Sequence, residues 1–351
     1  MHRLLPTSGF PAVVVAAALW VSTAEASQII STSSVQNLTL GVNAKGQAML
    51  TYISKGKTVH VLASGAVNAT APDDSRRQVS FHLEYDGGFR KLYTDNAVVK
   101  AAVADLRSLQ RQMTSATNAG NNPERYALAP RIAAVYAKLA GLRASAEGYW
   151  KTFTCPTYTG PTLAWRVAAC EAPDGSYWAV QEWQRKLPDY GEPPTPSEAA
   201  MEVHLSHWTG ALPVITVDLN WAYKKYDHLY GTLAYHGQPV HGFRSTTQGQ
   251  PLDTYGRNIF VDTFDSAYGT GWRRENSFLT HNPGGTFCYG FYPHEDHPAG
   301  TGTMYRATVL GPGVTPDVEW QGNAPGGYSP EPQAAANEAI LALDDPQCRP
   351  V

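Results

Sequence analysis

Alternating apolar and polar residues indicate short strands through most of the chain, joined by turns rich in glycine and asparagine. Residues 38–42, 47–54 and 58–67 have this pattern, with a glycine in each of the turns between them, and residues 78–85 add another strand. Within 47–54 both faces of the strand carry apolar side chains, so we expect a sheet that is covered on both sides. The N-terminal part is therefore predicted to be an antiparallel meander.

Residues 96–146 break this pattern and predict a helical hairpin. Asp95 or Asn96 can cap the first arm, and Asn122–Pro123 supplies the start of a second. Pro130 then lies inside the second arm, where a proline kinks a helix, so the long helix either continues through it or begins there. The apolar positions of the second arm repeat at intervals of four and three residues: Leu128, Ile132, Val135, Leu139 and Leu142.

Two interpretations of these apolar positions remain open. They could form a coiled coil that binds a partner, or they could pack the two arms on each other and on the sheet. The run lacks the three to four sustained heptads of a coiled coil, which favours the second interpretation. Strand signals stop at Tyr93 and resume at Trp150, so we expect the hairpin to be an insertion between strands.

Strand patterns and aromatic residues return between Trp150 and Trp221. Asp174–Gly175 is a strong hairpin turn between a run ending at Cys170, which is either helix-like or strand-like, and the strand that follows. In the strand that follows, alternation places Trp178 on one face and Trp183 on the other. Exposed rings there could stack on a sugar. Tryptophan in a strand is more often part of a half-buried core, and this is the favoured interpretation.

The C-terminal third is predicted to contain further strands between residues 230 and 292, an irregular loop and a short helix at 333–343. The fold class expected is mainly β, with antiparallel β-sandwich domains, an inserted helical hairpin and a short C-terminal helix. The expected organisation is a β-rich domain at 27–222 with the insertion at 96–146, a β-sandwich domain at 223–321, and a C-terminal loop and helix at 322–351.

The first 26 residues have the features of a secretory signal peptide. His2 and Arg3 precede the apolar run PAVVVAAALWV, and Ala24 and Ala26 are the small residues that a signal peptidase reads. The run is shorter than the roughly 20 residues that span a bilayer, and no later segment is apolar enough to span one. We therefore expect an exported, extracellular chain that begins at Ser27 and is not an integral membrane protein.

Charge and cysteine content narrow the possible partners and the compartment. The formal net charge is −3 and 16% of the residues are charged, which provides neither a basic field for nucleic acid nor a polybasic membrane patch. Four cysteines in an exported chain suggest two disulfides, for which three connectivities are possible. We expect Cys155–Cys170, which flanks a turn-rich segment, and Cys288–Cys348, which would tie the C-terminal tail to a strand.

A limited resemblance to a known family occurs within residues 231–262. The strand GTLAY, the turn Gly237–Val240 and the later turn Asp253–Gly256 before an inner strand resemble the carboxypeptidase-regulatory-like and transthyretin-like β-sandwich. This resemblance implies a seven-stranded accessory or surface module with no catalytic residues to carry over. The whole chain also resembles a group of secreted bacterial proteins, which implies export and no particular activity.

Histidines and carboxylates are the first candidates for chemistry. His204 and His207 lie in a segment that alternates like a strand, so they should point to opposite faces and not share a metal ion. A loop around His294 and His297 could hold an ion, although a solvated loop is the more common outcome. A further set near turns faintly resembles a calcium loop without matching the EF-hand pattern: Asp253, Asp262, Asp265 and Ser266.

The segment WRRENSFLTHN gives the last candidate site. Aromatic and cationic residues together make good recognition surfaces, so we expect the ligand site among Trp272, Arg274, Glu275, His281 and the loop from His294 to His297. No serine nucleophile elbow, phosphate loop or dinucleotide fingerprint occurs, and we expect no cofactor and no metal site. The expected function is a secreted, non-catalytic binding role toward a cell-surface glycan or protein. The alternative is a hydrolase of glycan or peptide, with Glu275 and His281 as the acid/base pair.

Overall fold

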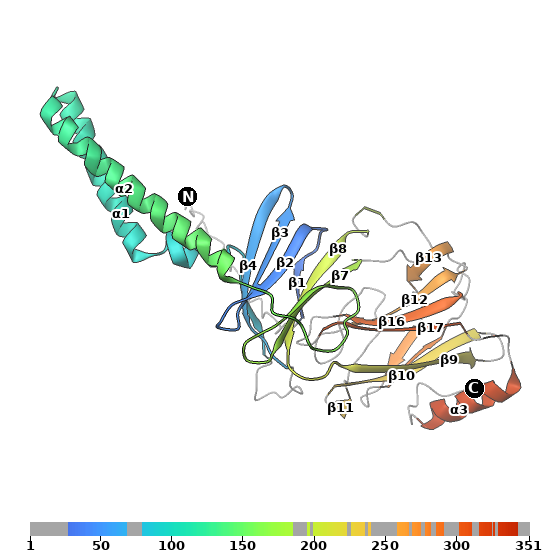
Figure 1. Cartoon of the computed structure of the whole chain (residues 1–351). Coiled ribbons are helices and arrows are strands. Elements are labelled where there is room, and N and C mark those ends of the chain that lie inside the picture. Colours follow the sequence, from blue (N-terminus) through green and yellow to red (C-terminus); the bar gives the residue numbers. More distant parts are fainter. Residues whose placement is uncertain are drawn as a thin grey trace, which may run out of the picture.

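The computed structural model consists mainly of antiparallel strands arranged in four sheets, with a long pair of helices that extends away from them (Figure 1). It describes residues 27–68, 79–184, 195–196, 199–222, 226–235, 238–239, 258–266, 269–274, 278–281, 286–290, 302–310, 316–324, 326 and 329–342. The predicted signal segment 1–26 lies outside this part of the chain.

The first sheet is the predicted N-terminal meander. Its order is β2 (Gln36–Val42), β3 (Ala48–Ser54), β4 (Lys57–Gly65) and β5 (Phe81–Glu84). A two-residue turn at Lys55–Gly56 joins β3 to β4, with φ of 50° and 73°. Two successive positive φ values match the right-handed twist of the flanking strands, which fixes the register of this hairpin.

The second sheet has the order β1 (Ser27–Ser31), β8 (Met201–Trp208), β7 (Tyr177–Gln184) and β6 (Arg166–Glu171). The predicted Asp174–Gly175 turn lies between β6 and β7. Strand β1 was not predicted, and it pairs with a strand far along the sequence, since Ser31 is opposite Val203. The first residue of β1 is the predicted mature N-terminus, Ser27.

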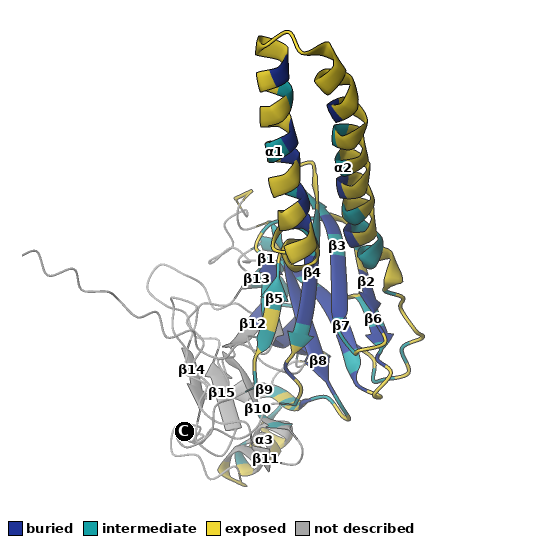
Figure 2. Ribbon diagram, turned by 90° about the vertical axis from the view of Figure 1, so that its left-hand side faces the viewer, coloured by how far each residue is buried: buried dark blue, intermediate teal, exposed yellow. Residues whose placement is uncertain are grey.

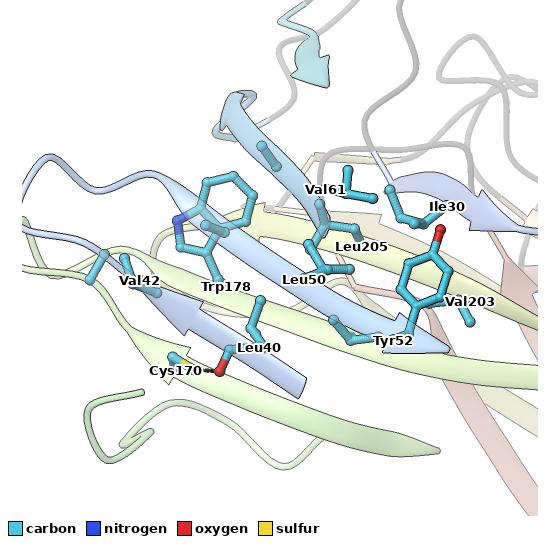
Figure 3. Close-up of a cluster of buried hydrophobic side chains, with 14 residues drawn as sticks. Ile30, Leu40, Val42, Leu50, Tyr52, Val61, Cys170, Trp178, Val203 and Leu205 are labelled. Atoms are coloured by element: carbon cyan, nitrogen blue, oxygen red, sulfur yellow. Dashed lines mark hydrogen bonds between the residues drawn. The ribbon is translucent and has the colours of Figure 1, made fainter. Parts of the chain in front are cut away.

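The two sheets share one apolar core, shown in Figure 3. Alternation along β3 directs Leu50 and Tyr52 into this core, and alternation along β7 directs Trp178 and Val180 into it from the other sheet. Trp178 is fully buried and donates its indole N–H to the carbonyl of Gly46 at 3.1 Å. Trp183, on the other face of β7, is 5% exposed, so both of these tryptophan rings are buried and do not form an exposed sugar platform.

The remaining strands form two further sheets. One has the order β13 (Gly269–Arg274), β12 (Asn258–Ser266), β16 (Met304–Leu310) and β17 (Val318–Asn323). The other has the order β11 (Gln238–Pro239), β10 (Tyr226–Tyr235), β15 (Thr286–Gly290) and β14 (Phe278–His281), with β9 (Val214–Ala222) also paired to β10. The domain boundary drawn at 222/223 thus falls between two paired strands.

Helices α1 (Ala97–Asn118) and α2 (Asn122–Gly148) occupy the range predicted for the hairpin, and α3 (Pro330–Ala342) that of the C-terminal helix. Asn96 caps α1 by accepting a hydrogen bond from the backbone N–H of Val98 at 2.9 Å. Helix α2 begins at Asn122 and continues through Pro130, so the alternative start at Pro130 is wrong.

The apolar residues of α1 and α2 pack on one another. Two clusters between the helices include Leu106 with Leu139 and Leu109 with Leu128, and neither cluster contains a strand residue. Figure 2 shows the two helices standing clear of the sheets, with their buried positions turned toward each other. The expected packing of the arms together is therefore present, whereas the expected packing on the sheet is not seen in these clusters.

The base of the helical pair is anchored by aromatic residues. Trp150 stacks on His60 with ring centroids 3.9 Å apart and donates its N–H to the carbonyl of Gly87 at 3.0 Å. Just before it, Tyr149 lies within hydrogen-bond distance of Asn43 and Gln47. Trp150, Tyr149 and the residues that they contact all lie outside α1 and α2.

Replacing residues 97–148 by a short Gly-Ser linker is expected to leave the sheets folded. The helices bury their apolar side chains against each other, so their removal takes little from the core, and the free energy of unfolding should change by less than about 1 kcal/mol. Urea unfolding followed by tryptophan fluorescence measures this. Loss of cooperative unfolding would show instead that the helices are part of the core.

The Cys155–Cys170 disulfide is formed, as the spacing predicted. It joins the segment after α2 to β6, and the chain-entropy model assigns such a 15-residue loop a stabilisation of about 3 kcal/mol. Of the second predicted pair, Cys288 belongs to β15 and Cys348 lies outside the described residues, so Cys288–Cys348 stays a prediction.

Candidate functional site

A buried ion pair lies at the centre of one face of the β13-β12-β16-β17 sheet. Strands β12 and β16 are in register so that Asp262 is directly opposite Arg306. Both Nε and one terminal nitrogen of Arg306 donate to the same oxygen of Asp262, at 3.0 and 2.8 Å. The Asp262 side chain is 0% exposed and that of Arg306 is 8% exposed. Such a pair is retained only where hydrogen bonds compensate for the lost hydration of both charges.

Two tryptophans flank the guanidinium of Arg306. Its central carbon lies 4.4 Å from the ring centre of Trp272 and 5.7 Å from that of Trp165. Trp272 belongs to β13 and also makes an edge contact with Phe264. A cation between aromatic faces is attracted by their negative faces, and this attraction is stronger when water is excluded. The arrangement therefore fixes the positions of both indole rings.

Trp165 is the most exposed member of this group. It lies in the turn before β6, 46% of its surface is exposed, and its φ is 53°. A positive φ is a rare and strained conformation for a bulky residue, costing on the order of 1–3 kcal/mol, and persists only when the surroundings impose it. Here the indole N–H donates to Glu319 at 2.7 Å, and the ring contacts Trp183 with centroids 5.6 Å apart.

Both oxygens of the Glu319 carboxylate accept hydrogen bonds. One oxygen of Glu319 accepts from Trp165, and the other accepts from the side-chain amide of Gln321. The Nε of Arg306 lies 3.9 Å from Glu319, whose side chain is 9% exposed. We call Trp165, Trp272, Arg306, Glu319 and Gln321 the indole–arginine site.

A second polar group fixes the sheet that carries Trp165 to the sheet that carries Arg306. The side-chain amide of Gln181 on β7 donates to the carbonyl of Asp317 and accepts from its backbone N–H, both at 3.0 Å. The amide of Gln181 also donates to the carbonyl of Ala164 at 2.8 Å, next to Trp165. A fully buried glutamine therefore sets the position of the Trp165 turn relative to β17.

His204 on β8 completes this junction between the sheets. Its side chain is 2% exposed, with Nδ1 2.8 Å from the carboxylate of Asp317 and Nε2 3.3 Å from that of Glu202. Burial alone lowers the pKa of His204, but the two carboxylates outweigh burial and raise this pKa to about 9. The imidazole is therefore positively charged at neutral pH and links β8 to the segment leading into β17.

The other histidine of this strand faces the opposite way, which confirms the prediction for β8. His207 stacks on Trp178 with ring centres 3.9 Å apart, and its Nδ1 lies 2.8 Å from the carbonyl of Gly65. Its Nε2 lies 2.7 Å from the hydroxyl of Ser176, which in turn lies 2.6 Å from Asp174. Burial lowers the pKa of His207.

The Ser176–His207 contact does not form a hydrolase site. In a Ser-His-Asp triad the carboxylate orients the histidine, whereas here Asp174 contacts the serine and a backbone carbonyl orients the ring. Ser176 is also 1% exposed, so a substrate cannot reach it. The group therefore joins the β6–β7 turn to the end of β4.

The residues predicted for the ligand site are distributed over two sheets. Trp272 and Arg274 lie on β13, where Arg274 is opposite Asp262, and His281 lies on β14 of the other sheet. Glu275, His294 and His297 lie outside the described residues, so the proposed acid/base pair of Glu275 and His281 stays a hypothesis. Trp272 is thus the predicted residue that the structure brings into the indole–arginine site.

The calcium alternative does not gain support from the two described aspartates. Asp262 is paired with Arg306, whereas Asp265 is exposed and accepts a hydrogen bond from the backbone N–H of Gly271 at 2.7 Å. Asp253 lies outside the described residues. Across the described ranges, no group of three or more histidine, cysteine or acidic side chains is arranged to hold a metal ion.

Comparison with known proteins gives no relative: no family model, curated protein or solved structure matches the chain. None of the helices in the described part of the chain combines the length and apolar character needed to cross a membrane. The interpretation of the site therefore depends on its geometry.

Sequence reasoning did not identify Trp165, Arg306 or Glu319. One usable signal was present, because Asp262 and Arg306 each interrupt an apolar strand with a charge, and a charge in a buried strand needs a partner. No comparable signal marks Trp165, whose position depends on a strained turn and on contacts between two sheets.

Proposed function

We propose that this protein is an exported, non-catalytic β-sandwich protein that binds a neutral glycan through the exposed ring of Trp165. The observation that carries the proposal is an exposed indole held at a positive φ, with its N–H bonded to Glu319 and its ring beside Arg306. Strain of this kind is found at sites where a side chain has to be presented in one orientation.

The chemistry of the ring suits a sugar. A pyranose has an apolar face of C–H groups and a rim of hydroxyls, which matches a flat apolar ring with polar groups at its edge. Gln321 is exposed beside Glu319 and supplies donor and acceptor capacity at that edge. A fixed ring loses little conformational freedom on binding, which favours affinity.

The contacts of the carboxylates favour binding over catalysis. Asp262 is buried against Arg306, and both oxygens of Glu319 already accept hydrogen bonds. A general acid or base has to reach the substrate, which neither group is placed to do. Export is supported by the signal-like N-terminus and by the Cys155–Cys170 disulfide, because disulfides persist in oxidising compartments.

The Trp165→Ala variant is expected to bind a neutral polysaccharide about tenfold more weakly than the wild type, since it removes the stacking ring. Retention on cellulose and on chitin, measured by depletion of protein from solution, gives the affinity. Val167→Ala is the matched control, because Val167 is 41% exposed two residues away and lies outside the indole–arginine site.

Equal binding by Trp165→Ala and the wild type would exclude this site. Release of reducing ends by the wild type that disappears in Glu275→Ala would establish the hydrolase instead. Thermal unfolding of each variant, followed by circular dichroism, separates loss of the ring from loss of the fold.

A further inference from the structure

We propose that the helical pair α1–α2 is a second binding site, for an acidic polysaccharide that lies along the helices. This inference is independent of the glycan site at Trp165. It depends on the charge of the helices, on their separation from the sheets and on a shallow hollow in the surface of α1.

Charge separates the helical pair from the rest of the chain. Residues 97–148 contain seven lysines and arginines and three acidic residues, a net charge of +4. The whole chain has a net charge of −3, so the remainder carries −7. A basic element on an acidic protein concentrates its attraction for anions in one place.

Most of this positive charge is available to a ligand. Two of the three acidic residues are engaged within the helical pair, Glu147 with Arg143 at 2.8 Å and Glu124 with the side chain of Asn121 at 2.9 Å. Lys100 pairs with Asp95 at the base. No ion pair within the described part of the chain involves the remaining basic residues of the two helices: Arg107, Arg111, Arg125, Arg131 and Lys138.

One exposed side of α1, next to α2, provides the clearest place for an anionic group. Arg107, Gln110, Arg111 and Thr114 are spaced at three and four residues, lie on one side of the helix and line a shallow hollow. The amide of Gln110 is held by the hydroxyl of Tyr136 on α2 at 3.0 Å. Arg107 and Arg111 are four residues apart, which places their backbones about 6 Å apart along the axis, and each guanidinium can bind a carboxylate or sulfate bidentately.

The distribution of charge favours an acidic polysaccharide over other polyanions. Helix α2 has 27 residues and is therefore about 40 Å long, so the five basic residues outside ion pairs occur about once every 8 Å of the pair. Double-stranded DNA carries one charge per roughly 1.7 Å and requires a denser basic field. The apolar residues of both helices face each other, which leaves no apolar face to enter a bilayer.

The exposed surface of the helical pair fits this partner. Figure 2 shows its outer faces exposed over nearly their whole length, and Tyr126 at 81% exposure and Tyr136 at 52% add rings that can contact sugars. A linear polymer can lie along such a rod and contact Arg107 and Arg111 in turn.

The test uses the full chain and polygalacturonate, a polymer of carboxylated sugars, with neutral dextran of the same length as the reference. The R107Q/R111Q variant is expected to bind polygalacturonate about tenfold more weakly and with a smaller dependence on salt. The matched control is K45Q/K57Q, which removes the same charge from exposed positions of the first sheet and should bind like the wild type.

Several outcomes would overturn the proposal. One is an equal loss of affinity for polygalacturonate in K45Q/K57Q, and another is equal binding of dextran and polygalacturonate by the wild type. The others are tighter binding of single-stranded DNA, or of vesicles with 30% anionic lipid, than of polygalacturonate, and a salt-sensitive dimer that R107Q/R111Q abolishes. Trp165→Ala should bind polygalacturonate normally, so a failure at the glycan site is distinguishable from a failure here. Circular dichroism at 222 nm confirms that the helices of each variant are intact.

Discussion

Replacing Asp262 with alanine is expected to lower the free energy of unfolding by about 3–5 kcal/mol, the largest effect of any single change considered. The substitution leaves the Arg306 guanidinium buried between two tryptophans without its main partner. An unpaired buried charge cannot recover its lost hydration, and relaxing the sheet to expose it would separate strands β12 and β16. Urea unfolding followed by tryptophan fluorescence measures the change.

A double variant separates the effect of an unpaired charge from the effect of lost side-chain volume. Asp262→Leu with Arg306→Met replaces both charges by apolar groups, and such replacements are often neutral or stabilising. We expect its stability to lie within about 1 kcal/mol of the wild type. If Asp262→Ala alone cost less than about 1 kcal/mol, the pair would not be buried as described.

Raising the pH from 6 to 9.5 is expected to lower the stability of the wild type by about 3 kcal/mol relative to the His204→Gln variant. The pKa of His204 is raised from 6.5 to about 9, because Asp317 and Glu202 favour the charged ring more than burial disfavours it. A raised folded-state pKa stabilises the protein fully below pH 6.5, and this contribution is lost as the pH rises through 9.

Unfolding midpoints in urea at several pH values measure this difference. His82→Gln is the matched control, because it makes the same substitution at a side chain that is 73% exposed and lies outside the junction between the sheets. Burial also lowers the pKa of His207, which opposes folding below the ordinary value of 6.5, but the wild type and His204→Gln share this contribution, so it cancels in the comparison. An identical pH slope in His204→Gln and the wild type would show that the ion pairs at the sheet junction do not form.

Local pattern predicted much of the fold where strands are adjacent in sequence. The strands that became β2, β3, β4 and β7 follow from alternation and turn residues alone, whereas the run that became β6 was open to either a helix or a strand. The opposite orientations of His204 and His207 followed from the same rule. These predictions succeeded because each depends on neighbours within a few residues.

Strand β1 and most of the indole–arginine site could not be predicted, because they depend on residues that are far apart in the sequence. Ser27–Ser31 is a strand because β8 pairs with it, and nothing in its five residues requires this. Trp272 was singled out for its own chemistry, yet the residues that give it a role come from β16, β17 and a turn before β6. Contacts between sheets leave no periodic trace in the sequence.

The pairing of β1 with β8 also determines the order in which the second sheet can assemble. Strands β6, β7 and β8 are consecutive and can form as a local meander, whereas Ser31 and Val203 are separated by 172 positions. Closing so long a loop costs chain entropy before any pairing compensates for it, so β1 joins as the last edge strand. The first strand along the described part of the chain is therefore the one that closes the sheet, and its edge hydrogen bonds should open before those of β7 in native-state hydrogen exchange.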